Sequence, residues 1–225
     1  MGVYFKNGLI LIKFMPKEYI SSFLDGNLYM NSLQYYIDLE NRTGVSGQGD
    51  KLEGSIPICD KVISNSNVQI KINVRYSAGY QNVPVFCMMY LEPNPYTLTY
   101  MITNEQQYKE MCSFSKDCVV IYDVKKFNNR FESACRALKY KFGHSLVHYM
   151  EENKDKDKKV KKIILKDDNR YKSVFCKDNK FKLQQEYRLA IFENIETPYT
   201  LNIGDIRDIS KVCRIEKFCR WMYPK

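Results

Sequence analysis

The pattern of apolar and polar residues predicts short strands and helices along the whole chain. Continuous apolar runs, which indicate strands buried on both faces, begin at residue 9 and recur at 85–91 and 118–122. Residues 68–75 alternate between apolar and polar side chains, which predicts a strand with one buried and one wet face. The strands predicted in this way are 9–15, 28–31, 68–75, 85–91, 118–122, 199–203 and 211–215.

Apolar residues at a period near 3.6 predict helices between these strands. Pro16 opens the first helix, and Ser32, Thr103 and Asp123 are suited to cap later ones. The elements together predict one α+β domain over residues 1–225, in which helices pack on a mostly antiparallel, twisted sheet. The helices predicted are 17–24, 33–40, 103–112, a segment that begins near residue 124, and 131–152, with a helical turn at 205–209.

The stretch 181–192 predicts a strand with a polar face. It is rich in Leu, Tyr, Ile and Phe and contains no Gly or Pro, yet Gln184, Glu186 and Arg188 occupy every second position. Because successive side chains of a strand point to opposite faces, these three share one face. If that face lines a cleft, the carboxylate between an amide and a guanidinium forms a site. If the face is solvated, the three residues form a cross-strand charge pattern.

A glycine-rich loop is predicted at 41–54. Glycine-rich loops can approach a ligand closely, but this one lacks the Gly-x-x-x-x-Gly-Lys-Ser/Thr pattern of a phosphate-binding loop. It presents Asp50 and Glu53, either on a plain surface loop or on a mobile binding loop. His144 and His148 lie four residues apart on the predicted helix, a spacing that suits zinc but that ordinary helix histidines also show. We therefore expect no metal.

Charge is concentrated in two parts of the chain, which has 225 residues and a net charge of +9. The basic stretch 154–166 holds much of the charge, and residues 207–225 add more. Such a balance permits binding to nucleic acid or another polyanion, and it also fits a solvated, lysine-rich loop. Residues 153–162 are expected to form an exposed basic loop or hinge.

Eight scattered cysteines form no Cys-x-x-Cys pair, which indicates reduced, buried thiols. The apolar residues 9–14 are too short for a signal segment or a membrane span. We therefore expect a cytoplasmic protein with no membrane contact. The oligomeric state stays open.

The pair Gln184-x-Glu186 resembles the Gln/Glu-x-Glu signature of ADP-ribosyltransferases. The resemblance implies that Glu186 is the catalytic carboxylate, which stabilises the sugar cation as nicotinamide leaves, and that Gln184 orients the acceptor. It also implies NAD as the substrate. The resemblance further implies that Lys13 takes the place of the family's early Arg or His. The nucleotide would be bound by Lys13 together with Asn27, Tyr29, Asn31 and Arg188.

A wider set of pieces resembles an uncharacterised family of bacterial and phage-associated proteins. These pieces are an early Leu-x-x-x-Lys-Phe strand at 9–14, a Gly-x-Leu-Tyr-x-Asn segment at 26–31, a Gly-Asp-x-x-Glu-Gly loop at 49–54 and the late Gln-x-Glu-Tyr-Arg at 184–188. The resemblance implies a phage-defence or toxin context. The leading hypothesis is an ADP-ribosyltransferase-like enzyme acting on NAD or a related nucleotide. The alternative is a non-enzymatic binding module for nucleic acid or for a phage or host protein.

Overall fold

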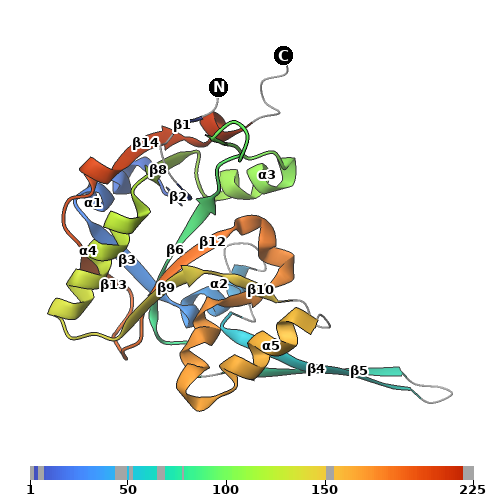
Figure 1. Ribbon diagram of the computed structural model, residues 1–225. Helices are drawn as coiled ribbons and strands as arrows, with labels where there is room; N and C mark the ends of the chain where they lie inside the picture. Colours follow the sequence, from blue (N-terminus) through green and yellow to red (C-terminus); the bar gives the residue numbers. More distant parts are fainter. Residues whose placement is uncertain are drawn as a thin grey trace.

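The computed structural model describes residues 3–4, 8–43, 50, 53–64, 69–77, 79–150 and 155–219. Helices and a mostly antiparallel sheet form an α+β fold, which confirms the predicted fold class (Figure 1). The strands are Val3–Tyr4 (β1), Ile10–Phe14 (β2), Asn27–Ser32 (β3), Ser55–Ser64 (β4), Gln69–Ser77 (β5), Pro84–Leu91 (β6), Thr99–Tyr100 (β7), Asp117–Ile121 (β8), Phe142–Leu146 (β9), His148–Met150 (β10), Cys176–Asp178 (β11), Glu186–Ile191 (β12), Tyr199–Asn202 (β13) and Ser210–Arg214 (β14). The α-helices are Ile20–Leu24 (α1), Leu33–Thr43 (α2), Glu105–Phe114 (α3), Val124–Ala137 (α4) and Asp155–Ile164 (α5). The 3-10 helices are Lys17–Tyr19 (η1), Asp167–Phe175 (η2), Asn179–Gln184 (η3), Arg207–Ile209 (η4) and Ile215–Phe218 (η5).

The main sheet is built around β6. Its strand order is β13-β3-β6-β2-β8-β14, and β12 also pairs with β6 and carries β9 on its other edge. All these pairings are antiparallel. The strands β6 and β2 are rich in fully buried side chains, as their continuous apolar runs predict. The strand β6, which joins the two parts of the sheet, is therefore largely shielded from water.

Apolar side chains cover both faces of the sheet. On one face α1 and α4 bury Phe23, Phe127 and Phe131 against side chains of β6 and β12. On the other face α3 and η5 pack Met111 and Phe218 against β2, β6 and β8. A separate cluster joins α2 and η2 to β6 and β12 on that second face. The second face thus holds two apolar clusters, with α3 in one and α2 in the other.

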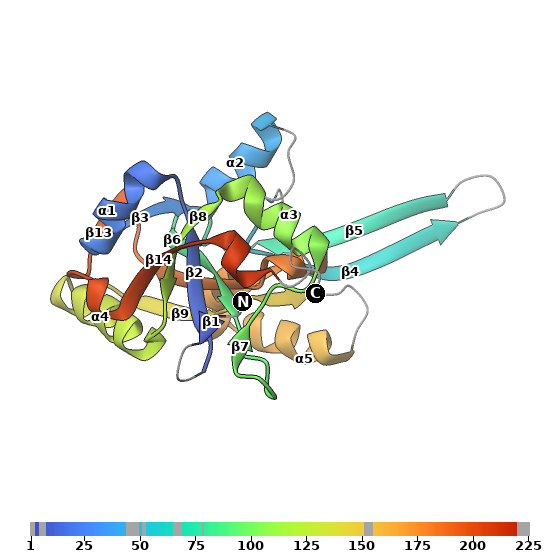
Figure 2. The same ribbon diagram turned by 90° about the horizontal axis from the view of Figure 1, so that it is seen from above.

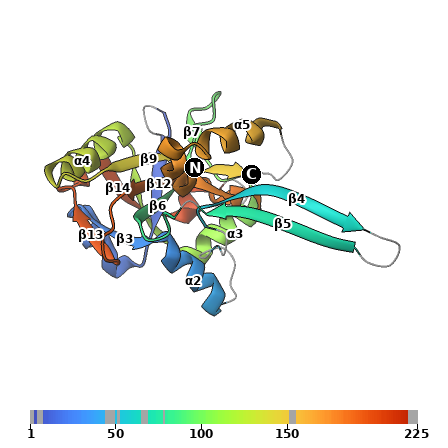
Figure 3. The same cartoon turned by 90° about the horizontal axis from the view of Figure 1, so that it is seen from below.

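The strands β4 and β5 form a hairpin that extends away from the rest of the chain as a two-stranded arm (Figures 2 and 3). They pair from Ser55↔Ser77 to Ser64↔Gln69, with an irregularity between Pro57 and Cys59. The predicted strand 68–75 is thus β5. The base of the arm lies against β11 and η2. The predicted strand 85–91 is β6.

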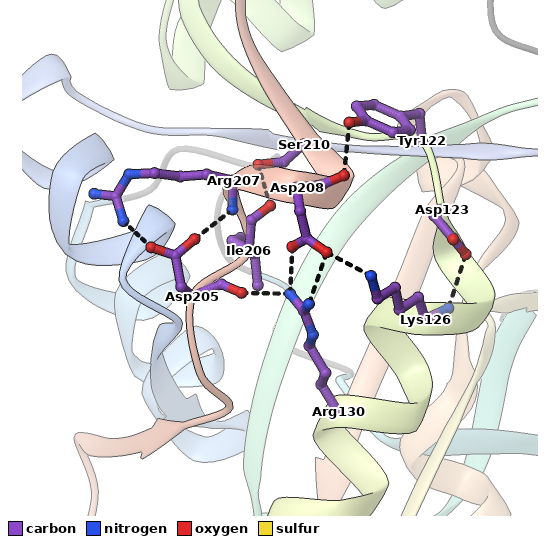
Figure 4. A network of polar contacts seen from close by, with 9 residues as sticks. All are labelled: Tyr122, Asp123, Lys126, Arg130, Asp205, Ile206, Arg207, Asp208 and Ser210. Atoms are coloured by element: carbon purple, nitrogen blue, oxygen red, sulfur yellow. Dashed lines mark hydrogen bonds and ion pairs between the residues drawn. The ribbon is translucent and has the colours of Figure 1, made fainter.

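A polar network fastens α4 to the turn that contains η4 (Figure 4). The Asp208 carboxylate accepts hydrogen bonds from Lys126 and from Arg130, whose Nη2 lies 2.9 Å from Oδ2. Arg130 also donates to the backbone carbonyl of Asp205. Hydrogen bonds from Arg130 and Lys126 lower the pKa of Asp208 to about 2. The carboxylate therefore stays charged, and the link persists, throughout the neutral range.

The predicted helix 131–152 is wrong beyond Ala137. Leu138 caps α4, and Lys139 adopts a left-handed conformation with φ of 59°, which turns the chain out of the helix. The strands β9 and β10 follow. The apolar spacing continued past the helix end, because strand residues that pack on the core can match a helical period over a few positions.

The predicted exposed loop or hinge at 153–162 is also wrong where the structure describes it, because residues 155–164 form α5. Its high charge resembles that of a disordered segment. Val160 and Ile164 nevertheless lie four residues apart and pack against Ile56 and Met150. Burial of this apolar pair stabilises a helix whose remaining surface is rich in lysine.

The predicted strand 181–192 begins later than expected. Residues 179–184 form η3, whose first turn is capped by the Asp178 carboxylate at the Lys180 amide. Gln185 then adopts a left-handed conformation with φ of 42°, and β12 starts at Glu186. At α3, Asn104 is the cap rather than the predicted Thr103. Ser32 and Asp123 accept hydrogen bonds from amides of the helices that follow them, as predicted.

No helix within the described ranges combines the length and the apolar character that crossing a membrane requires. None of the seven cysteines whose side chains are described forms a disulfide, and five of them are buried.

Two glycines allow a matched test of close backbone packing. Gly26 has φ of +88°, and a Cβ there would overlap the backbone of Gly204, whereas Gly79 has φ of +81° and open space around its Cβ position. We expect Gly79→Ala to lower the free energy of unfolding by about 1–2 kcal/mol through backbone strain. Gly26→Ala adds overlap with backbone atoms, for a total of about 2–3 kcal/mol. Urea unfolding of both variants measures the difference, and equal losses would show that the approach of Gly204 is unimportant.

Candidate functional site

A pocket forms where the sheet divides at β6. On one edge β6 pairs with β12, from Glu186↔Met89 to Ala190↔Val85. On the other edge it pairs with β2 at its C-terminal end and with β3 at its N-terminal end. In the described part of the chain, no strand pairs with residues 86–88 on that second edge. The strands β2 and β3 therefore separate there, and we name this opening the fork.

The pocket has a volume of about 290 Å³ and lies between α2 and α3. Its residues come from β2, β3, α2, the turn before β4, β6, α3, β11, η3 and β12. One wall is apolar, with Phe14, Met111 and Phe114 among its members. A second group of lining residues, the polar wall, is polar and charged. The lining residues are Ile12, Lys13, Phe14, Asn31, Tyr35, Tyr36, Leu39, Glu53, Cys87, Met88, Met89, Met111, Phe114, Lys177, Gln184, Glu186 and Arg188.

Four buried charged side chains form the polar wall, and we name them the ion cluster: Glu53, Lys177, Glu186 and Arg188. Arg188 Nε lies 2.7 Å from Glu186 Oε1, and its Nη2 lies 2.9 Å from Glu53 Oε1. Lys177 Nζ lies 3.1 Å from Glu186 Oε2 and 3.5 Å from Glu53 Oε2. Each carboxylate thus contacts both cations, so the four charges form a closed ring of ion pairs.

Further hydrogen bonds hold the two cations in place. Lys177 Nζ donates to the Gln184 side-chain oxygen at 2.8 Å. The Arg188 guanidinium also donates to the backbone carbonyl of Val174 in η2. Buried charges are tolerated only when they are paired and hydrogen-bonded, and these contacts supply both conditions. The cluster therefore joins β12, β11, η2, η3 and the turn before β4.

The electrostatics of the cluster keep Glu186, Lys177 and Arg188 charged. Burial by itself would raise the pKa of Glu186, but Arg188 and Lys177 outweigh it and hold that pKa at about 2. Burial likewise favours neutral Lys177, but Glu186 and Glu53 outweigh it and raise the pKa. Burial, followed by the Glu186 charge, raises the pKa of the Cys87 thiol to about 12. The thiol stays protonated near neutral pH, so it is a poor nucleophile.

Lys13 lies at the fork, outside the ring of ion pairs. It is half-buried, and its Nζ donates to the backbone carbonyl of Cys87 at 2.8 Å and lies 4.3 Å from the centre of the Phe86 ring. Burial lowers the pKa of Lys13, although Cys87 and Glu186 act in the opposite direction. No carboxylate of the described residues lies within ion-pair distance of this ammonium.

The structure brings together six of the nine residues that the sequence singled out. They are Lys13, Asn31, Glu53, Gln184, Glu186 and Arg188. The polar face predicted for Gln184, Glu186 and Arg188 thus lines a pocket, even though Gln184 belongs to η3 and not to the strand.

Three predicted residues lie elsewhere. Tyr29 shares a face of β3 with Asn31, but each pair of residues advances a strand by about 7 Å, so Tyr29 lies further from β6 and is exposed. Asn27 lies further still and accepts a hydrogen bond from Asn202 of β13. Asp50 is buried outside the pocket lining. For Asn27, Tyr29 and Asp50 the predicted contribution to a ligand pocket is therefore not supported. Most of the loop that precedes Glu53 lies outside the described residues.

The histidines belong to a different part of the fold. His144 lies on β9 and His148 on β10, so they share no helical face. His144 Nε2 lies 3.0 Å from Glu132 of α4, and its Nδ1 lies 2.8 Å from the Tyr187 hydroxyl. Across the described ranges, no three His, Cys, Asp or Glu side chains are arranged to hold a metal ion.

Sequence reasoning missed Lys177, which completes the ion cluster. It stands in β11, a strand of three residues with no periodicity to detect. The only signal was a lysine next to buried Cys176, and a surface lysine would give the same signal.

Comparison of the chain with protein-family models, with curated proteins and with solved structures found no match.

Proposed function

We propose that the protein binds a small molecule of the nucleotide class in this pocket. The observation that supports the proposal is the pairing of an apolar, partly aromatic wall with a wall of fixed buried charges. Ligand pockets combine apolar surface with a few fixed polar groups in this way, because the first supplies affinity and the second sets orientation. A volume of about 290 Å³ is near the lower end of such pockets, so a mononucleotide or half of a dinucleotide suits it.

The geometry of Glu186 favours a positioning role over a catalytic one. In the ADP-ribosyltransferase hypothesis its negative charge stabilises a sugar cation. Here Oε1 contacts Arg188 and Oε2 contacts Lys177, so two fixed cations already neutralise that charge. With its pKa at about 2, the carboxylate is also a weak base. We therefore assign Glu186 to holding Arg188 and Lys177 in the pocket wall.

Ligand binding is tested by thermal shift with AMP, nicotinamide mononucleotide and NAD. Because a ligand that binds only the folded protein must stabilise it, we expect at least one mononucleotide to raise the melting temperature by several degrees at millimolar concentration. Leu39 is a half-buried residue of α2 that lines the pocket, so Leu39→Trp should fill the pocket and abolish the rise in melting temperature. Leu138→Trp, at an exposed position after α4, is the matched control and should retain it. The absence of any shift in the unmodified protein would refute the proposal.

The same protein samples, incubated with NAD, decide between binding and cleavage. We expect no release of nicotinamide above the rate in buffer. Release that disappears in Glu186→Gln, while AMP still stabilises that variant, would overturn the positioning role and establish an ADP-ribosyltransferase-type reaction.

A further inference from the structure

The fork carries an excess of positive charge. The pocket lining contains three cationic side chains, Lys13, Lys177 and Arg188, against two carboxylates, Glu53 and Glu186. Lys177 and Arg188 are matched by the two carboxylates within the ion cluster. The difference of one positive charge therefore resides on Lys13, at the open edge of β6.

The surroundings of Lys13 match the hydrogen-bond donors and the charge of its ammonium only in part. An ammonium has three N–H donors, and the Cys87 carbonyl is a neutral acceptor for one of them. The Phe86 ring face adds a weaker attraction. A half-buried ammonium beside neutral partners is less stable than one that contacts an anion, because desolvation is not offset by an opposite charge. An anion that entered the fork would supply that charge.

Neutral hydrogen-bonding groups border the same end of the pocket. Asn31 lines it from β3, across the fork from Lys13, and Tyr35 and Tyr36 line it from the first turns of α2. The apolar residues Phe14 and Phe114 lie beyond Lys13 toward α3, with their ring centres 6.5 Å apart. The pocket therefore combines cationic and hydrogen-bonding groups at the fork with an aromatic pair toward α3.

We infer that the fork is a phosphate subsite, in which the Lys13 ammonium leaves the Cys87 carbonyl and binds the phosphoryl group of a phosphorylated ring compound, whose ring lies toward Phe14 and Phe114. This inference rests on the proposed function and deepens it, because it assigns the ligand's charge and its orientation. A hydrogen bond between two charged groups is stronger than one to a neutral carbonyl, so the exchange of partners favours the bound state.

The affinities of AMP and adenosine, measured by isothermal titration calorimetry, test the inference. The unmodified protein should bind AMP about 10- to 100-fold more tightly than adenosine, the range expected for one charge-assisted hydrogen bond. Lys13→Met should remove this preference while adenosine affinity is retained. Lys13→Arg should keep most of the preference, and Lys109→Met, at an exposed lysine of α3, should leave it unchanged. Circular dichroism verifies that each variant is folded.

The outcomes separate this inference from the proposed function. Equal affinities for AMP and adenosine in the unmodified protein would leave the pocket as a ligand site and overturn the phosphate subsite. A preference for AMP that survives in folded Lys13→Met would also overturn it, because another group would then hold the phosphate. Failure of both compounds to bind would refute the phosphate subsite together with the mononucleotide proposal.

Discussion

Arg188→Met should lower the free energy of unfolding by about 3–5 kcal/mol, the range for removing one partner of a buried ion pair. The side chain is 1% exposed, and it contacts both Glu53 and Glu186. Methionine retains part of the volume but leaves two buried carboxylates with Lys177 as their one remaining cation in the cluster. Urea unfolding at neutral pH measures the loss.

Two further variants make this prediction specific. Arg207→Met removes an exposed arginine that pairs with Asp25 and Asp205, and it should change stability little, because solvent screens such pairs. Adding Glu53→Gln to Arg188→Met should recover part of the stability, since it removes a carboxylate left without its arginine. A loss below about 1 kcal/mol in Arg188→Met would show that the cluster is not needed for folding.

Acid should destabilise the protein through Glu186. Its pKa is about 2 in the folded protein against an ordinary value of 4.5, so the folded state binds the proton less tightly than the unfolded state. The resulting stabilisation is complete above pH 4.5 and is lost as the pH falls toward 2. A shift of this size corresponds to about 3 kcal/mol.

Glu186→Gln isolates this contribution. Between pH 6 and pH 3 its stability should fall less steeply than that of the unmodified protein, measured by urea unfolding at each pH. Asp208→Asn is the matched control: Asp208 also has a pKa of about 2, but it is exposed, so its removal should alter the slope less. Parallel slopes for the unmodified protein and Glu186→Gln would contradict the prediction.

The central strands β2, β6 and β8 could be predicted because each contains a continuous apolar run. Most residues of these three strands are buried, and a continuous apolar run can be recognised without knowing which strands pair with it. The end of α4 was mispredicted because Lys139 has an unusual backbone conformation that no residue type announces. The helix α5 was missed because the packing of two aliphatic side chains outweighs the seven charged residues among its ten, which is a tertiary effect.

The site was predicted where a polar residue interrupts an apolar context. Lys13 ends a buried strand, and Glu186 and Arg188 alternate with Tyr187 and Leu189, so both signals are local. Lys177 gave no such signal, because its role depends on two carboxylates at distant positions, Glu53 and Glu186. Tyr29 and Asn27 were included with Asn31 through the family resemblance, which does not give how far along β3 each residue lies from β6.

The fork also determines where backbone hydrogen bonds of the sheet can break most easily. Residues 86–88 are bonded to a neighbouring strand on one edge only within the described part of the chain, so separating them breaks about half as many backbone hydrogen bonds as elsewhere along β6. Local opening there therefore breaks fewer backbone hydrogen bonds than opening of the flanking parts of the strand. The ion cluster thereby holds one side of the pocket fixed, while residues 86–88 of β6 beside it can separate more easily. A ligand can enter there while the rest of the sheet stays paired.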